Sequence, residues 1–130
     1  MTQTISVEIA PGELIDKITI LQIKSERIED AQKLDNVRVE LETLEACRDA
    51  AVPASAEMER LTTALREINE ALWVIEDDIR DRERAGDFGD TFVQLARSVY
   101  VTNDKRAALK RNINVLLGSR LVEEKSYQPY

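Results

Sequence analysis

The chain has 130 residues, 43% of them hydrophobic, with only four glycines and three prolines, so it can bury the core of one domain without disulfides. Its formal net charge is -7 and its basic residues are mixed with acidic ones, which argues against nucleic-acid binding, because that affinity comes from clustered lysines and arginines. Histidine is absent and cysteine occurs once, so zinc and most transition metals lack their usual ligands. No signal peptide or membrane-spanning run is recognisable, and we expect a cytoplasmic protein without a membrane partner.

The N-terminal part of the chain combines an alternating segment with an amphipathic helix. Residues 4–9 alternate apolar and polar side chains, which predicts a short extended segment. Pro11 then begins a helix predicted at about residues 12–29. Apolar side chains surround so much of this helix that it should contact more than one neighbour. Asp16 and Lys17 lie beside its apolar stripe, so we expect each to reach a neighbouring helix.

A second helix is predicted at residues 31–51. Asp30 precedes it as an N-cap, and Pro53 follows its end, because the residue before a proline is pushed out of helical geometry. Cys47 lies among leucine and alanine residues, which predicts a small buried side chain.

Two long helices, predicted at residues 56–85 and 90–117, dominate the rest of the chain. Ser55 caps the first of them, and Gly86 ends it. In both, apolar residues recur at alternating spacings of three and four, which predicts that the helices pack lengthwise, as in a coiled coil. The stripes are Met58, Leu61, Leu65, Ile68, Leu72, Ile75 and Ile79, and Phe88, Phe92, Leu95, Val99, Thr102, Arg106, Leu109, Ile113 and Leu116. We therefore predict an all-α fold, an antiparallel bundle of three or four helices built on this hairpin, as a single domain over residues 1–130.

Pairing the stripes across the turn places polar residues in the seam of the hairpin. Arg106 falls between apolar layers, where a guanidinium must be paired or solvated. Glu67 and Glu70 of the facing helix lie within about one turn of it and are its predicted partners. On the same register, Glu76 comes opposite Arg97.

This polar layer has two interpretations. The first is structural, because buried polar residues fix the register and pairing of helices at some cost in stability. The second is a pocket for a small anionic ligand, such as a nucleotide, a sugar nucleotide or a dicarboxylate, lined by basic side chains at three- and four-residue steps and walled by aromatic residues. The candidate ligand-binding residues are Arg97, Asn103, Arg106, Lys110, Trp73 and Tyr100, with Glu67, Glu70 and Glu76 from the facing helix.

An acidic run in the third predicted helix provides weaker candidates for a metal site. Asp77 and Asp81 are one helical turn apart, a spacing at which two carboxylates can share a Mg²⁺ ion that keeps several waters. The run resembles the acidic helix faces of all-α nucleotide pyrophosphohydrolases, although their glutamate and aspartate spacing differs. Glu76 precedes Arg80 by four residues, which favours a surface of ion pairs instead. Beyond this Mg²⁺ no cofactor is predicted. A serine or cysteine nucleophile is not expected, because no histidine is present to act as its base, and no catalytic residue is assigned.

The tail, residues 118–130, and the length of the hairpin both bear on partners. Tyr127 and Tyr130 flank a proline, so the tail either folds back over one end of the bundle or offers a short peptide to a protein partner. A helix of about 30 residues is about 45 Å long, and one shorter hairpin cannot cover a pair of that length completely. We therefore predict that the exposed stripe is buried in a homodimer.

Several segments of the chain resemble a known protein family. They are PGELIDKITILQIKSERI, KLDNVRVEL, LWVIEDDIRDRE, FVQLARSVYVTNDKRAALKRNIN and EEKSY. The likeness spans nearly the whole chain, apart from the stretch around residues 50–59. The family is bacterial and carries only a domain-of-unknown-function label, so the resemblance implies a small stand-alone protein without an assigned activity. We predict a non-catalytic interaction or scaffold module, with a binder or enzyme for a small anionic ligand as the alternative.

Overall fold

The computed structural model describes residues 3–130, which form four helices and no strand. The helices are α1 (Pro11–Arg27), α2 (Ala31–Ala51), α3 (Ala56–Ala85) and α4 (Asp90–Leu116). The predicted all-α bundle is therefore confirmed, and α2 and α3 have the bounds expected from the sequence. None of the helices within residues 3–130 combines the length and the apolar character needed to cross a membrane.

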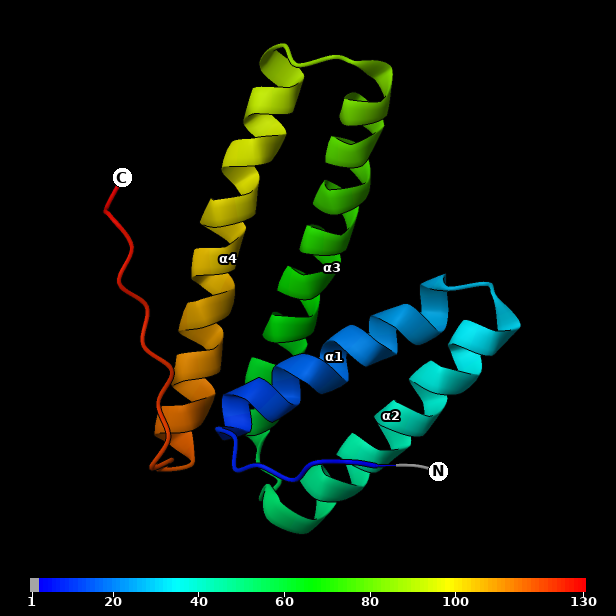
Figure 1. Ribbon diagram of the computed structural model, residues 1–130. Helices are drawn as coiled ribbons and strands as arrows, with labels where there is room; N and C mark the ends of the chain where they lie inside the picture. The colour runs from blue at the N-terminus through cyan, green and yellow to red at the C-terminus, as the bar shows by residue number, and fades with distance from the viewer. Residues whose placement is uncertain (1–2) are drawn as a thin grey trace.

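The two long helices α3 and α4 form the predicted antiparallel hairpin (Figure 1). The Ser55 side chain caps α3 by accepting a hydrogen bond of 3.0 Å from the backbone N–H of Met58. Gly86 ends α3 in the left-handed region, with φ of 67°, which glycine adopts without a steric penalty. Asp87 then holds the turn, because its carboxylate accepts a hydrogen bond from the backbone N–H of Gly89.

A second, shorter hairpin made of α1 and α2 crosses the first one (Figure 1). Its α1 helix packs against all three other helices, whereas α2 packs on α1 alone. The Asp30 side chain caps α2 through the backbone N–H of Lys33, as predicted. We call residues 56–72 and 103–116, which include the contacts with α1, the base of the long hairpin, and residues 73–102, next to the Gly86 turn, its distal half.

The hydrophobic core lies where α1 crosses the base. Its centre is a cluster of nearly inaccessible side chains from α1, α3 and α4, namely Ile15, Met58, Leu61, Leu65 and Ile113. Val52, Leu109 and Leu117 pack around this cluster. In the distal half, by contrast, the stripe residues Ile75, Ile79, Phe92, Leu95 and Val99 are only partly buried, because two helices alone leave both sides of their seam open.

The N-terminal segment and Cys47 both lie at the surface. Residues 3–10 are not helical and find no partner strand within residues 3–130, and Ile5 and Val7 are exposed. The prediction that Cys47 is buried is wrong, because its side chain is exposed. It lies on α2, which among residues 3–130 has α1 as its only helical neighbour and Val37 as its only buried side chain.

Candidate functional site

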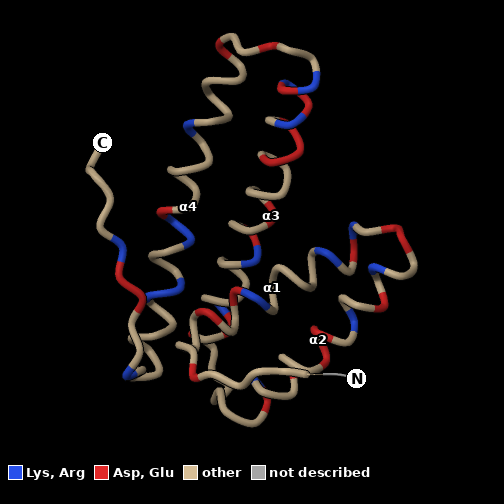
Figure 2. The backbone as a smooth tube through the Cα atoms, viewed as in Figure 1, with Lys and Arg blue, Asp and Glu red and all other residues tan. Residues whose placement is uncertain are grey.

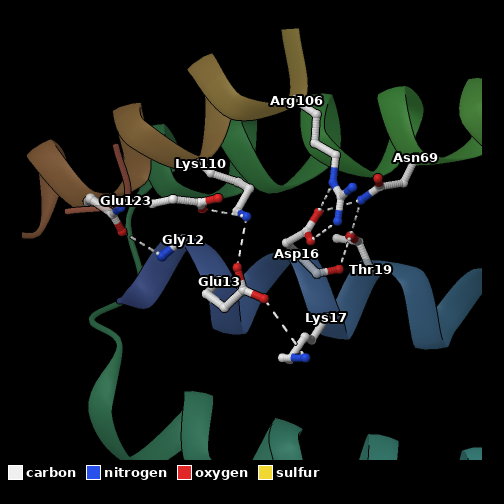
Figure 3. Close-up of polar contacts among 10 residues, drawn as sticks. Gly12, Glu13, Asp16, Lys17, Thr19, Asn69, Arg106, Lys110 and Glu123 are labelled. Carbon is white, nitrogen blue, oxygen red and sulfur yellow. Dashed lines mark hydrogen bonds and ion pairs between the residues drawn. The ribbon is translucent and has the colours of Figure 1, made fainter. Parts of the chain in front are cut away.

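A polar cluster lies where α1 crosses α3 and α4 (Figure 3). At its centre, the carboxylate of Asp16 accepts two hydrogen bonds from the guanidinium of Arg106, at 2.9 Å from Nε and 2.5 Å from Nη2. The Asp16 side chain is 1% exposed and that of Arg106 is 30% exposed. This bidentate geometry, with two parallel hydrogen bonds, is the strongest form of arginine–carboxylate contact.

The predicted partners of Arg106 are therefore wrong. Glu70 contacts Arg27 of α1 instead, at 3.5 Å, and Glu67 is exposed on α3. The physical reason is the crossing of α1, which brings the Asp16 carboxylate directly into the seam between the two long helices.

Neighbouring polar groups complete the hydrogen bonds of Asp16. The Asn69 side-chain amide donates to the Asp16 carboxylate at 2.9 Å and to the Thr19 hydroxyl oxygen at 3.0 Å. The Thr19 hydroxyl in turn donates to the backbone carbonyl of Asp16 at 2.8 Å. Burial disfavours the charged carboxylate, but hydrogen bonds from Arg106 and Asn69 outweigh burial and hold the pKa of Asp16 below its ordinary value of 3.8. Throughout residues 3–130, every buried side-chain polar atom has a hydrogen-bond partner.

Lys110 forms a second part of the cluster, one helical turn after Arg106 on α4. Its ammonium lies 2.7 Å from the carboxylate of Glu13 on α1 and 2.7 Å from that of Glu123 in the tail. Burial disfavours the charged ammonium, but these two carboxylates outweigh burial and raise the pKa of Lys110 above its ordinary value of 10.5. Lys110 therefore ties α1, α4 and the tail together.

The start of α1 touches the backbone of α4. The Gly12 N–H donates a hydrogen bond of 2.7 Å to the side-chain oxygen of Asn114. A Cβ atom at position 12 would lie 2.3 Å from the backbone carbonyl oxygen of Lys110, well inside normal contact distance. Only glycine therefore allows α1 to approach α4 this closely.

An open groove of about 1240 Å³ lies between α4 and the tail, next to the polar cluster. Residues 123–130 form its tail side. Four of the predicted ligand-binding residues, Tyr100, Asn103, Arg106 and Lys110, contribute to its α4 side. The structure thus brings these four together on one solvent-connected surface.

The other predicted ligand-binding residues lie elsewhere. Arg97 is exposed on α4 and Trp73 is partly buried on α3, and neither lines the groove. Glu67 borders a separate shallow hollow on α3. Glu76 forms an ion pair with Arg80 of its own helix, as the four-residue spacing favours.

The predicted metal candidates are partly engaged in other contacts. Asp81 forms an ion pair of 2.5 Å with Arg84, and Asp77 is exposed. Within the described part of the chain, no three acidic or cysteine side chains come together in a way that could hold a metal ion.

Comparison with protein families identifies the chain. A family model described as "Family of unknown function (DUF6165)" matches residues 5–130. The chain belongs to this family. Searches of curated proteins and of solved structures find no match. For this member of the family, the roles of individual residues therefore have to be argued from their geometry.

In this family member, sequence reasoning located one side of the polar cluster and missed the other. It singled out Arg106 and Lys110, and it correctly expected Asp16 to reach a neighbouring helix. It did not find Asn69 or pair Asp16 and Glu13 with these two bases, and Lys17 pairs within α1 with Glu13 instead of reaching another helix. A signal was present in α1, where the small or polar residues Gly12, Asp16 and Thr19 recur at spacings of four and three. Such spacing places them on one helix face, which is the face that meets α3 and α4.

Proposed function

We propose that the protein is a non-catalytic interaction module that forms a homodimer through the distal half of its long hairpin. The observation that carries this proposal is the incomplete burial of the distal stripe. Phe88 of the stripe is 56% exposed, and Val74, Val93 and Val101, which lie beside the stripe in the sequence, are exposed as well. Exposed apolar side chains that gather on one part of a folded protein often mark a contact site.

The shape of the molecule favours a second copy as the occupant of this surface. The 30 residues of α3 extend for about 45 Å, and α1 covers only the base (Figure 1). A half-covered helical pair becomes fully covered when it forms a four-helix arrangement. A second copy supplies a stripe with the same spacing, and a two-fold axis makes such a contact self-complementary.

The charges of the distal half are partly neutralised within the chain. This part of α3 has the acidic run at residues 76–78, followed by mixed acidic and basic residues (Figure 2). Two of the acids pair within the helix, Glu76 with Arg80 and Asp81 with Arg84. These pairs reduce the repulsion between like charges when two copies approach each other.

The polar cluster supports a structural rather than a catalytic role. Arg106 is matched by Asp16, and Lys110 is matched by Glu13 and Glu123. Cations already paired within the chain have less to gain from a ligand, because binding must first break those pairs. The cluster instead specifies where α1 lies on the hairpin.

Sedimentation equilibrium of the full chain tests the homodimer. We expect a dimer at micromolar concentrations, and a Phe88→Ser substitution should raise its dissociation constant about tenfold, as for an anchor residue of an interface. Val39→Ser is the matched control, because Val39 is exposed on α2, away from the long hairpin of α3 and α4. A wild-type chain that stays monomeric at 100-fold higher concentration would contradict the proposal.

A second candidate function, binding of a small anion, rests on the groove beside α4. Its support is the convergence of Asn103, Arg106 and Lys110 on one open surface. A thermal-shift screen with nucleotides, sugar nucleotides and dicarboxylates, with and without Mg²⁺, tests it, because a ligand that binds only the folded state raises the melting temperature. Asn103→Ala should abolish a true shift and Arg97→Ala should not. A screen without any shift argues against this candidate.

A further inference from the structure

The C-terminal tail lies along α4 and runs in the opposite direction (Figure 1). Two successive tail acids pair with two successive bases of α4, Glu123 with Lys110 at 2.7 Å and Glu124 with Arg111 at 3.3 Å. The next tail residue, Lys125, forms an ion pair of 2.6 Å with an α4 acid, Asp104. The tail therefore follows α4 in a defined register of charges.

The last residue of the chain extends this register. The Tyr130 hydroxyl donates a hydrogen bond to the carboxylate of Asp104. The Tyr130 ring meets that of Tyr100 edge to face, with centroids 5.0 Å apart, a favourable arrangement for two aromatic rings. The α4 surface thus presents basic, acidic and aromatic contacts one after another.

Most contacts that hold the tail on α4 lie at the surface. Tyr127 is 82% exposed, and Tyr130 is exposed too despite its contacts. In the described part of the chain, no backbone hydrogen bond joins residues 122–130 to the helices. Apart from the pair of Glu123 with the buried Lys110, the ion pairs of the tail are exposed and contribute little each. The tail is therefore held largely because it is tethered nearby, at a high effective concentration.

The register also indicates what kind of molecule fits the surface. Residues 100–111 of α4 span about 16 Å, which matches a short extended peptide and exceeds the size of a single phosphate or carboxylate group. A small anion would use the bases at one end and leave Asp104 and Tyr100 unused. An extended peptide that carries acids first and an aromatic residue later uses the whole surface.

We propose that this α4 surface docks an extended peptide of another protein that carries two acidic residues, then a lysine and a tyrosine, and that the C-terminal tail covers the surface until such a peptide displaces it. The docking surface lies mainly on the base of the long hairpin, whereas the proposed homodimer uses the exposed apolar stripe of the distal half. The partner segment must resemble the chemistry of residues 123–130, because that chemistry is the one that the surface already pairs with.

Nuclear magnetic resonance of the ¹⁵N-labelled full chain tests this proposal with a synthetic peptide of residues 121–130. The probe is added to the wild type and to a double variant, Glu123→Gln and Glu124→Gln. The variant removes two ion pairs of the tail and leaves Lys110 its second partner, Glu13. We expect the tail amides to be more mobile in the variant. The peptide should shift the amides of residues 100–111 and bind the variant about tenfold more tightly than the wild type, because the tail competes in cis.

Matched controls decide whether recognition follows the register. A peptide in which both glutamates are replaced by lysine should not bind, and Lys105→Gln, a substitution of an exposed α4 residue that does not line the groove, should leave binding unchanged. The proposal is overturned if the peptide shifts no amide of residues 100–111, or if it binds both chains equally. It is also overturned if inorganic phosphate alone removes the peptide completely, which indicates a small-anion site, or if the tail exchanges only between copies of this chain.

Discussion

The base and the distal half of the long hairpin carry the same repeat of apolar residues but bury it to different extents. At the base, Leu61, Leu65 and Ile113 are almost inaccessible, whereas Ile75 and Leu95 in the distal half are only partly buried. The difference is α1, which crosses the base and leaves the distal half uncovered (Figure 1). A stripe at helical spacing therefore shows which side chains can be buried, and the crossing of α1 decides which of them are buried.

The polar cluster lies among the contacts that join α1 to the base. Asp16 meets Asn69 of α3 and Arg106 of α4, so it fixes the position of α1 against both helices at once. Buried polar pairs of this kind require one geometry, since any shift of α1 would leave a buried carboxylate without its partners. The cluster thus contributes specificity to the base, and the distal half contains no equivalent contact with α1.

The largest expected effect comes from removing the same side chain in the two regions. Leu65→Ala should lower the free energy of unfolding by about 3–5 kcal/mol, because Leu65 is fully buried. Leu95→Ala should cost about 1 kcal/mol in the monomer, because the partly exposed side chain loses less buried area. Urea unfolding at low protein concentration measures both. Equal losses would show that the two regions do not differ in burial as described.

Replacing the central acid tests the polar cluster and its pH dependence. Asp16→Asn should cost about 2–4 kcal/mol at neutral pH, because it leaves the Arg106 charge without its carboxylate partner. The pKa of Asp16 is lowered in the folded state, so its stabilising contribution is complete above the ordinary value of 3.8 and is lost as the pH falls through the lower folded-state pKa.

The measurement for this prediction is the unfolding free energy of wild type and variant at a series of pH values. The difference between them should stay constant from neutral pH to about pH 5 and shrink in more acidic solution. Asp104→Asn is the control. Asp104 is not buried and its pKa is lowered mainly by the hydrogen bond from Lys125, so this substitution should change the free energy of unfolding much less than Asp16→Asn does. A difference that grows as the solution is acidified would contradict the assignment.

Two glycines allow a smaller, local comparison of the base with the turn at the distal end. Gly12→Ala should lower the free energy of unfolding by about 2–3 kcal/mol. The added Cβ would meet the backbone carbonyl of Lys110, and neither helix backbone can shift easily. Gly86→Ala should cost about 1 kcal/mol, because the space around it is free and only its left-handed conformation is strained. Thermal unfolding of both variants measures the order, and a larger loss for Gly86→Ala would reverse the interpretation.

Much of the fold was predictable because helix ends depend on local interactions. Asp30 and Ser55 cap their helices as expected, and Gly86 ends α3. The long hairpin followed from the matching stripes on α3 and α4 and the turn between them. In the candidate site, Arg106 stood out because a guanidinium interrupts an apolar stripe. Its true partner was not predictable in this way, because ninety residues separate it from Asp16.

The amino-acid sequence by itself determined the four helices, their caps and the pairing of α3 with α4, since these follow from contacts between residues a few positions apart and from one tight turn. Only the tertiary structure decided the crossing of α1, the pairing of Asp16 with Arg106 and the course of the tail along α4. Those features depend on contacts between distant segments, and helical spacing does not specify the angle at which one helix crosses another.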